Sequence, residues 1–388
     1  MSSFSSLVLR ILEKAAETCL FWEGKILLRQ GRLEEFVNHV MDPEFDYKPY
    51  LKQVNPYYAR HGFKFSMVEA EYNSRLSGVK SDLYISNTFF RHYLVPFLNG
   101  DGKNVDKNMF RKLLGNGNPR KKVAFTMAEQ VTYNMNGVFY DGNDDCISPD
   151  EAVRLVMAYD KDLIVKPTLN TTWGKGVIKL SRNERSEEKV RQLFAQYRKD
   201  FSFEECVIQH PDLASLNESS LNTVRICTYR RPNGEIKYLF SILRFGEKGS
   251  VVDNASAGGN FVGVMPDGTI KRKMVKYHSL EQHPFNHALE KVPCFERLKA
   301  TAIHLHSKLA DLNYVGWDFS VTPDGIPVVI ELNQSPAVNG FQMTVGPAFS
   351  KEDLDELLPL IKQRKVSCQA FPTITFADKR GKSARIKG

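Results

Sequence analysis

Long apolar runs are missing from the sequence. Nowhere does it hold the roughly 18 consecutive apolar residues that a membrane-spanning helix needs, so we expect no transmembrane segment. No two of its six cysteines are close enough for a CxxC motif, which argues against a zinc ribbon or a disulfide framework. The phosphate-binding consensus GxxxxGK[ST] is absent too, because Phe376 stands where the first glycine before Gly381 would be required. No GxSxG or Cys–His arrangement points to a nucleophilic enzyme.

The composition is that of an ordinary globular protein. Its 388 residues, 42% hydrophobic and 25% charged, suffice for about two to three domains with full cores. The net charge of +8 is concentrated in the last ten residues, which hold five basic and no acidic side chains. We therefore expect a solvated basic tail and no nucleic-acid partner.

The N-terminal residues and the cysteines indicate the cellular compartment in which the protein resides. Apolar residues recur at spacings of three and four over residues 4–20, but Glu13, Lys14 and Glu17 interrupt them, which predicts an amphipathic helix rather than a signal peptide. Docking of this helix at a membrane surface is an alternative. Scattered cysteines are typical of reduced thiols, so we expect a cytoplasmic protein.

Residue periodicity divides the chain into a helical first part and a mixed remainder. Helical patterns cover 4–30, 32–41 and 64–76, and later 149–159, 187–198, 294–311 and 351–365. Short β-like runs cover 122–125, 163–165, 176–180, 206–209, 223–229 and 236–245. Hairpin turns are predicted at 232–234 and 323–325. The absence of a regular βαβ alternation favours an α+β fold.

The segment 316–333 carries the clearest chemical signal. Two β-like runs joined by the second hairpin turn place Asp318 on one strand and Glu331 and Asn333 on its partner. Glu331 and Asn333 are two residues apart and so share a face, and the turn register can bring Asp318 opposite them. Oxygen ligands of this kind suit one or two Mg²⁺ ions that also hold phosphates. A solvated hairpin edge is the alternative, although a carboxylate directly after an apolar run needs a strong partner.

A second signal is a lysine that ends an apolar strand. Lys166 follows the run at 163–165, and a loop with Gly174, Lys175 and Gly176 comes next. A lysine in this place can contact phosphate while the loop's backbone N–H groups cover the anion. The alternative is a lysine that ends the strand only for solubility.

Two arginines and one loop lie between these signals. Arg225 and Arg244 lie in β-like runs, and their planar guanidinium groups suit a γ-phosphate or an acyl phosphate. Salt bridges on a sheet surface are the alternative. Asn260 ends a loop, 254–260, whose small and amide residues can approach an anion or an amine substrate closely. A flexible surface loop is the rival interpretation.

The order of these motifs resembles the ATP-grasp superfamily, and most closely its sugar-transfer-associated subgroup. The resemblance spans roughly 105–350 and is carried by 165–167, 173–176, 209–211, 221–225, 254–260 and 316–339. It implies an α+β ATP-grasp fold in which two α+β subdomains clamp ATP. The expected parts are a mostly helical N-terminal region (1–105), a lid subdomain (106–210), a central subdomain with the metal site (211–370) and a basic tail (371–388).

The resemblance also implies roles for the phosphate-binding residues. Lys166 looks like the lysine that contacts the α- and β-phosphates of ATP. Lys107 resembles the first ATP-binding lysine, with Lys121 and Lys122 as alternatives. Glycines 174 and 176 are similar to the mobile flap over the phosphates, and Trp173 within it would exclude water.

Further matches concern adenine and the metal. The segment 207–211 sits where the family's interdomain hinge pairs its backbone with adenine, which assigns Gln209, His210 and Pro211 to nucleotide binding. Many family members have a glutamate where Gln209 stands, so the ribose ligand is left unassigned. Asp318, Glu331 and Asn333 match the family's Mg²⁺ ligands.

The implied activity is that of an ATP- and Mg²⁺-dependent carboxylate–amine ligase, with Mn²⁺ as an alternative metal, acting through an acyl phosphate. Its partners would be a small carboxylate and an amine, and the family name implies joining an amino acid or amine to a sugar acid in bacterial surface-polysaccharide biosynthesis. Two alternatives stay open: an ATP-dependent phosphotransferase acting on a sugar or small molecule, and a non-catalytic nucleotide-binding module. The sequence leaves the substrates and the oligomeric state undetermined.

Overall fold

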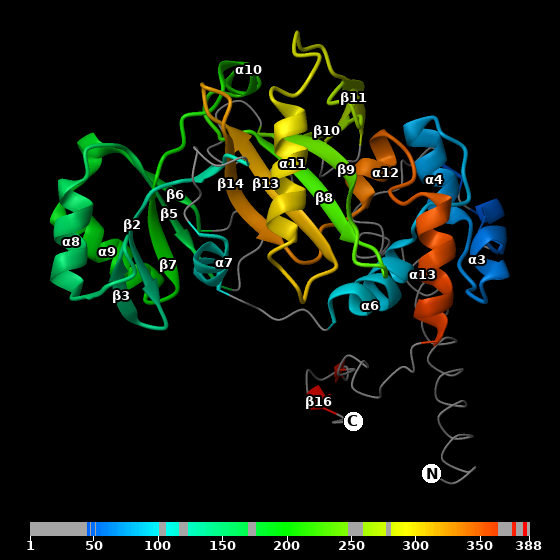
Figure 1. Ribbon diagram of the computed structural model, residues 1–388, viewed down its shortest axis with the longest axis horizontal. Coiled ribbons are helices and arrows are strands. Elements are labelled where there is room, and N and C mark those ends of the chain that lie inside the picture. The colour runs from blue at the N-terminus through cyan, green and yellow to red at the C-terminus, as the bar shows by residue number, and fades with distance from the viewer. Residues whose placement is uncertain are drawn as a thin grey trace.

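Three β-sheets, of six, eight and two strands, and the helices around them make up the described part of the chain, as a computed structural model shows (Figure 1). It describes residues 45–46, 48–50, 52–100, 106–115, 123–169, 176–246, 259–276 and 281–363, and the backbone of β15 (Thr375–Ala377) and β16 (Ser383–Arg385). A small sheet of six strands lies on the left in Figure 1, and a large sheet of eight strands lies in the middle. The predicted α+β class is confirmed. The helical patterns expected within 4–41 and the side chains of the basic tail lie outside the described residues.

The small sheet is antiparallel throughout, with the order β4-β3-β2-β7-β5-β6. Its strands are β2 (Gln130–Met135), β3 (Val138–Asp141), β4 (Cys146–Ile147), β5 (Leu163–Pro167), β6 (Ile178–Leu180) and β7 (Phe201–Glu205). Helices α8 (Pro149–Ala158) and α9 (Glu187–Tyr197) cover one face over a core that includes Val165 and Phe203. Both helices begin at a serine whose Oγ accepts a backbone N–H, and both confirm the periodicity prediction.

The large sheet has the order β1-β14-β13-β8-β9-β10-β11-β12, in which only the β1–β14 pair is parallel. Its strands are β1 (Thr126–Met127), β8 (Thr223–Arg230), β9 (Ile236–Phe245), β10 (Asn260–Val264), β11 (Ile270–Lys276), β12 (Gln282–Pro284), β13 (Tyr314–Val321) and β14 (Pro327–Asn333). Both hairpin turns predicted from the sequence are confirmed. Helix α11 (Phe295–His306) packs on one face, over alternate residues such as Val224, Leu243 and Trp317. We call the opposite face the site face.

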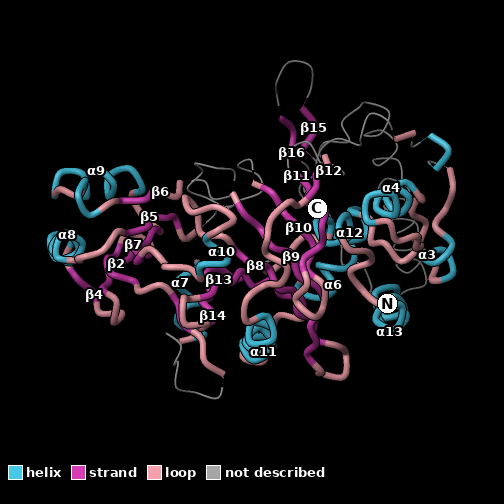
Figure 2. The backbone as a smooth tube through the Cα atoms, turned by 90° about the horizontal axis from the view of Figure 1, so that it is seen from above, coloured by secondary structure: helices cyan, strands magenta, loops and turns pink. Residues whose placement is uncertain are grey.

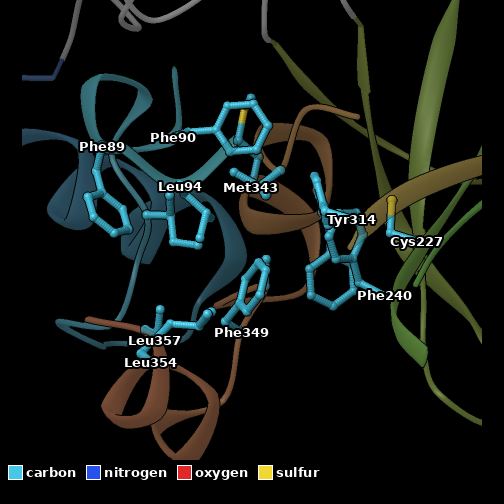
Figure 3. Close-up of a cluster of buried hydrophobic side chains, with 14 of the residues drawn as sticks. Phe89, Phe90, Leu94, Cys227, Phe240, Tyr314, Met343, Phe349, Leu354 and Leu357 are labelled. Atoms are coloured by element: carbon cyan, nitrogen blue, oxygen red, sulfur yellow. The ribbon is translucent and has the colours of Figure 1, made fainter. Parts of the chain in front are cut away.

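The N-terminal helices cover one end of the site face. They are η1 (Lys48–Tyr50), α3 (Pro56–Arg60), α4 (Val68–Ser77), α5 (Asn87–Phe89), η2 (Phe90–Leu94) and α6 (Val95–Asn99), and they meet α12 (Asn339–Thr344) and α13 (Lys351–Gln363) at the right of Figure 1. Figure 3 shows Phe89 and Leu94 packed with Phe349 and Leu357 beside Tyr314 of the sheet. Figure 2, seen from above, shows α4 and α12 side by side, and the two helices are in contact. One continuous core therefore joins residues far apart in the sequence.

Two amides fasten these helices to the rest of the chain. The Gln342 side chain accepts a hydrogen bond from the Ile85 backbone N–H at 2.9 Å and donates one to its carbonyl at 3.0 Å. Asn99 Oδ1 accepts from the backbone N–H groups of Asn313 and Tyr314, at 2.9 and 3.0 Å. Both amides satisfy backbone groups of segments that lie far from them in the sequence.

Two strand predictions were misplaced. The strand expected at 206–209 is β7, which ends at Glu205, because the run that pairs with β5 is Phe201 to Glu205 and the chain then leaves the sheet. The strand expected at 122–125 begins only at Thr126, where pairing with β14 starts. None of the helices in the described ranges has the length and the apolar character that a membrane-spanning segment needs.

A buried histidine predicts a pH-dependent stability. His306 Nδ1 lies 2.7 Å from Thr228 Oγ1 and Nε2 lies 2.9 Å from the Leu312 carbonyl, and burial lowers its pKa to about 4. Because the unfolded side chain has a pKa near 6.5, the unfolded state binds more protons between these values, and stability falls as the pH falls through this window. We expect a loss of about 2–3 kcal/mol in the free energy of unfolding, measured by urea denaturation at several pH values. The His306→Gln variant should lack this part of the slope, and an unchanged slope would contradict the assignment.

Candidate active site

The hairpin of β13 and β14 carries the candidate metal ligands, and we call it the metal hairpin; it brings Asp318 opposite Glu331, as the sequence suggested. Asp318 on β13 lies directly opposite Glu331 on β14, and Gly316 lies opposite Asn333. A β-bulge follows Asp318, so that Ile330 is the extra residue on β14. Since side chains alternate between faces, Asp318, Glu331 and Asn333 all lie on the site face, at the end that the N-terminal core leaves uncovered.

The Asp318 carboxylate is held by two arginines. Arg225, its direct neighbour on β8, binds with Nε to Oδ1 at 2.7 Å and with Nη2 to Oδ2 at 2.8 Å. Arg244 on β9 adds Nη1 to Oδ2 at 3.1 Å, and Asn333 Nδ2 reaches Oδ2 at 3.3 Å. Burial would raise the pKa of Asp318, but the two guanidinium groups outweigh it and lower the pKa to about 2. Asp318 is therefore a carboxylate throughout the physiological range.

Glu331 forms an ion pair with Lys107, the residue that resembles the first ATP-binding lysine of the family. Lys107 Nζ lies 2.9 Å from Glu331 Oε1, and both side chains are about one-third exposed. Lys107 begins α7 (Lys107–Leu114), whose cap is the carboxylate of Asp106. The Thr168 hydroxyl donates to Asp106, and the Lys107 N–H donates to the Thr168 carbonyl just beyond β5. Helix α7 thus ties the small sheet to the metal hairpin.

Lys166 pairs with a glutamate that the sequence analysis did not single out. Its Nζ lies 2.7 Å from Glu204 Oε2, on the face of the small sheet opposite α8 and α9. Glu204 is only 7% exposed; burial would raise its pKa, but Lys166 and Arg111 outweigh burial and lower it. Ser202 also donates to Glu204 at 2.8 Å. Glu204 could have been identified from the sequence as an acidic residue two positions after Ser202, on the strand that pairs with the strand of Lys166. That strand was predicted at 206–209 instead of 201–205, so Glu204 was missed.

The hinge side chains are engaged in local contacts. Gln209 Nε2 donates to the Ser220 carbonyl at 2.8 Å, and its Oε1 accepts from the Asn222 N–H at 2.9 Å. The His210 N–H donates to the Val321 carbonyl at 2.6 Å, while its Nδ1 accepts from the N–H of Asp212. Pro211 is the first residue of α10 (Pro211–Ala214). These contacts fix the backbone of the hinge against β13, and its role in adenine binding stays a prediction.

Asn260 does not join the arginines. It is the first residue of β10 and pairs with Phe245, whereas Arg244 pairs with Phe261, so Asn260 faces the opposite side of the sheet from Arg244. Trp173, Gly174, Lys175, Lys121 and Lys122 lie outside the described residues, as does 254–258. Gly176 is described; it adopts φ +77°, and its carbonyl accepts a hydrogen bond from the Tyr197 hydroxyl.

The family follows from a direct comparison. The sequence matches the family model described as sugar-transfer associated ATP-grasp over residues 106–356. The chain belongs to this family. ATP-grasp enzymes are ATP-dependent ligases that generally use Mg²⁺, so the resemblance predicted from the motifs is confirmed at that level.

Several solved structures are similar to this chain. They include VanG D-Ala:D-Ser ligase from Enterococcus faecalis (16% identity, covering 66% of this chain and 61% of that chain, TM-score 0.40) and D-cycloserine synthetase DcsG (14%, 67% and 70%, 0.38). D-alanine–D-alanine ligase from Bacillus anthracis is another (17%, 67% and 67%, 0.35). The chain thus spans about three-fifths of the length of the VanG enzyme. No curated protein matches the sequence.

The donor set of this ATP-grasp chain fits magnesium. Mg²⁺ in phosphate-transfer sites is usually held by one or two carboxylates together with phosphate oxygens. Asp318 and Glu331 supply two carboxylates on one face, and Asn333 supplies an amide beside them. Within the ranges that the structure describes, no three His, Cys, Asp or Glu side chains are placed to hold a metal ion. The site would therefore depend on the Asn333 carbonyl oxygen and on ligands from the nucleotide.

The backbone at Gly316 is tightly packed against the segment that follows Asn333. A Cβ added there would lie 2.5 Å from the Cβ of Pro336, in the segment that follows Asn333. We expect Gly316→Ala to displace that segment and to lower the free energy of unfolding by about 1–3 kcal/mol, as overpacking does. Thermal unfolding measures this loss, and Mg²⁺ titration should show weaker binding because Asn333 moves. The control is Gly137→Ala on a surface turn, where a Cβ meets nothing within 4 Å. That control carries only the strain of its positive φ, so an equally weakened Mg²⁺ affinity in both variants would contradict the prediction.

Proposed function

We propose that the chain is an ATP- and Mg²⁺-dependent carboxylate–amine ligase that works through an acyl phosphate. The observation that carries the proposal is the grouping of Arg225 and Arg244 with Asp318, beside Glu331 and Asn333, on one face of the large sheet. Phosphoryl transfer to a carboxylate brings two anions together, so catalysis depends on positioning and on concentrated positive charge. The grouping offers both a metal-ligating set and guanidinium groups within it.

Each residue of the group has a proposed task. Lys166 would hold the α- and β-phosphates from the small sheet, and Lys107 would approach them from the N-terminus of α7. Asp318, Glu331 and Asn333 would hold Mg²⁺, which neutralises phosphate charge and aligns the triphosphate when bound. An arginine of the large sheet would face the transferred phosphoryl group. Four cations (Lys107, Lys166, Arg225 and Arg244) and the three carboxylates that pair with them (Asp318, Glu331 and Glu204) give this cluster a formal charge of about +1 before metal and nucleotide bind, which suits an anionic ligand.

The family description supports a finer proposal for the substrates. We infer that the enzyme joins an amino acid or another amine to a sugar acid or related carboxylate, in the biosynthesis of bacterial surface polysaccharide. The description "sugar-transfer associated" is what supports the sugar-acid side. The need for ATP favours a reaction in the cytoplasm.

The test is turnover with pooled substrates. The purified chain is incubated with ATP, Mg²⁺ and pools of sugar acids and amines, and ADP release and product masses are measured. We expect ADP together with a condensed product, and a hydroxamate when hydroxylamine replaces the amine, because hydroxylamine traps an acyl phosphate. A phosphate-ester product that does not react with hydroxylamine would instead favour a phosphotransferase. Nucleotide binding without turnover would favour a non-catalytic module.

A further inference from the structure

The two oxygens of the Asp318 carboxylate accept unequal numbers of hydrogen bonds, and Oδ2 is the crowded one. Among the described residues, Oδ2 accepts from three donors, Arg225 Nη2, Arg244 Nη1 and Asn333 Nδ2, whereas Oδ1 accepts from Arg225 Nε alone. A carboxylate oxygen has about two lone pairs, so Oδ2 has no acceptor capacity left. Asn333, the neighbouring metal ligand in the proposed site, contacts Asp318 at Oδ2. A metal ion shared by these two residues therefore lies on the side of the crowded oxygen.

We propose that Arg244 is a place-holder for the metal: it occupies Asp318 Oδ2 in the metal-free enzyme, leaves when Mg²⁺ binds, and is thereby freed to meet the phosphoryl group. Arg225 keeps its contacts and positions Asp318 in both states. The inference rests on the proposed function and divides between two residues the roles that the sequence could not tell apart. The Asn333 amide turns at the same step, so that its oxygen, rather than its NH₂ group, faces the metal.

The geometry of the two arginines is the reason for this division. Arg225 is the direct cross-strand neighbour of Asp318 and binds with two parallel hydrogen bonds, the arrangement in which a guanidinium holds a carboxylate most firmly. Arg244 pairs on β8 with Thr223, so its side chain crosses β8 to reach Asp318. With Asp318 it makes one bond, which at 3.1 Å is longer than either bond of Arg225 to the same carboxylate. Of the arginine contacts with Asp318, this single, longer one is the one that a divalent cation displaces.

The test is Mn²⁺ binding to the full-length chain without nucleotide, followed through the EPR signal of free Mn²⁺. Arg244→Gln should bind Mn²⁺ about tenfold more tightly than the wild type, because no donor has to leave Oδ2. Arg225→Gln should bind about tenfold more weakly, because Asp318 loses its support. Both variants lose one positive charge, so a mere charge effect would move both affinities in the same direction. Arg272→Gln, an exposed arginine that contacts Glu290 and the His287 carbonyl, is the matched control and should leave the affinity unchanged.

A second measurement covers the case in which Arg225→Gln fails to fold. In wild-type protein with isotope-labelled arginine, Mg²⁺ should shift the side-chain Nε–H resonance of Arg244 and leave that of Arg225 in place. Equal shifts of both resonances, or an Arg244→Gln variant that binds Mn²⁺ no more tightly than the wild type, would overturn the inference while leaving the ligase proposal intact. No Mn²⁺ binding by the wild type, even with a non-hydrolysable ATP analogue, would overturn both.

Discussion

Replacing Asp318 by asparagine is expected to stop turnover and to destabilise the fold at the same time. Replacing a residue that merely supports a metal ligand costs about 10- to 100-fold in activity, so if Asp318 is the ligand that we propose, its loss should cost more than about 100-fold. The side chain is 2% exposed and neutralises two guanidinium groups. Removing one partner of a buried ion pair costs about 3–5 kcal/mol, because the charge that remains is buried without compensation.

ADP release and denaturant unfolding measure the two losses separately. Asp311→Asn, at an exposed aspartate just before β13, is the matched control and should change neither quantity. Addition of Mg²⁺ and an ATP analogue should raise the unfolding temperature of the wild type and leave that of Asp318→Asn unchanged. A variant that keeps wild-type stability would mean that the two arginines find other partners, and the account of this cluster would then be wrong.

The second large effect is expected at Lys166. Lys166→Met leaves the Glu204 carboxylate buried with only Ser202 and Arg111 near it, which should lower the free energy of unfolding by about 3 kcal/mol. If Lys166 also contacts phosphate, the affinity for a nucleotide analogue should fall about 10- to 100-fold, the equivalent of one charge-assisted hydrogen bond. Unfolding curves and calorimetric binding measure the two effects.

A double variant separates the two roles of Lys166. Lys166→Met combined with Glu204→Gln removes both charges, so most of the lost stability should return while the nucleotide affinity stays low. Glu205→Gln in place of Glu204→Gln is the control. Glu205 is the next residue of the same strand, but it contacts Lys161 and Tyr159, so its replacement should restore no stability. Recovery of nucleotide affinity in the double variant would show that Lys166 acts only through Glu204.

The metal hairpin was predictable because its information is local. A tight turn at 323–325 pairs two strands that follow each other directly, so Asp318 and Glu331 were expected close together. The turn register alone would place Asp318 opposite Ile330, and the β-bulge at Ile330, which the turn does not encode, brings Glu331 opposite Asp318. The helices α8 and α9 were predictable for the same reason, since their serine caps and apolar periodicity lie within one segment.

Contacts between distant segments were not predictable. That Arg225 and Arg244 both reach Asp318 depends on β8 lying between β9 and β13, and no residue within these strands encodes that order. The Lys166–Glu204 pair depends likewise on β5 pairing with β7 across an intervening helix. Asn260 was grouped with the arginines by its place in the sequence, although the alternation of β10 turns it to the other face. Pairing order is a property of the whole chain, because it is selected by how the faces pack.

The shared core of the N-terminal helices and the large sheet limits how this chain can be truncated or recombined. The family match begins at residue 106, but Phe89 and Leu94 lie in the same buried cluster as Phe240 and Tyr314 (Figure 3). A truncated chain that starts at the family boundary would present that apolar surface to water and would be prone to aggregate. Chimaeras with other ATP-grasp enzymes should therefore carry the helices from α3 to α6 along with the sheet that they cover.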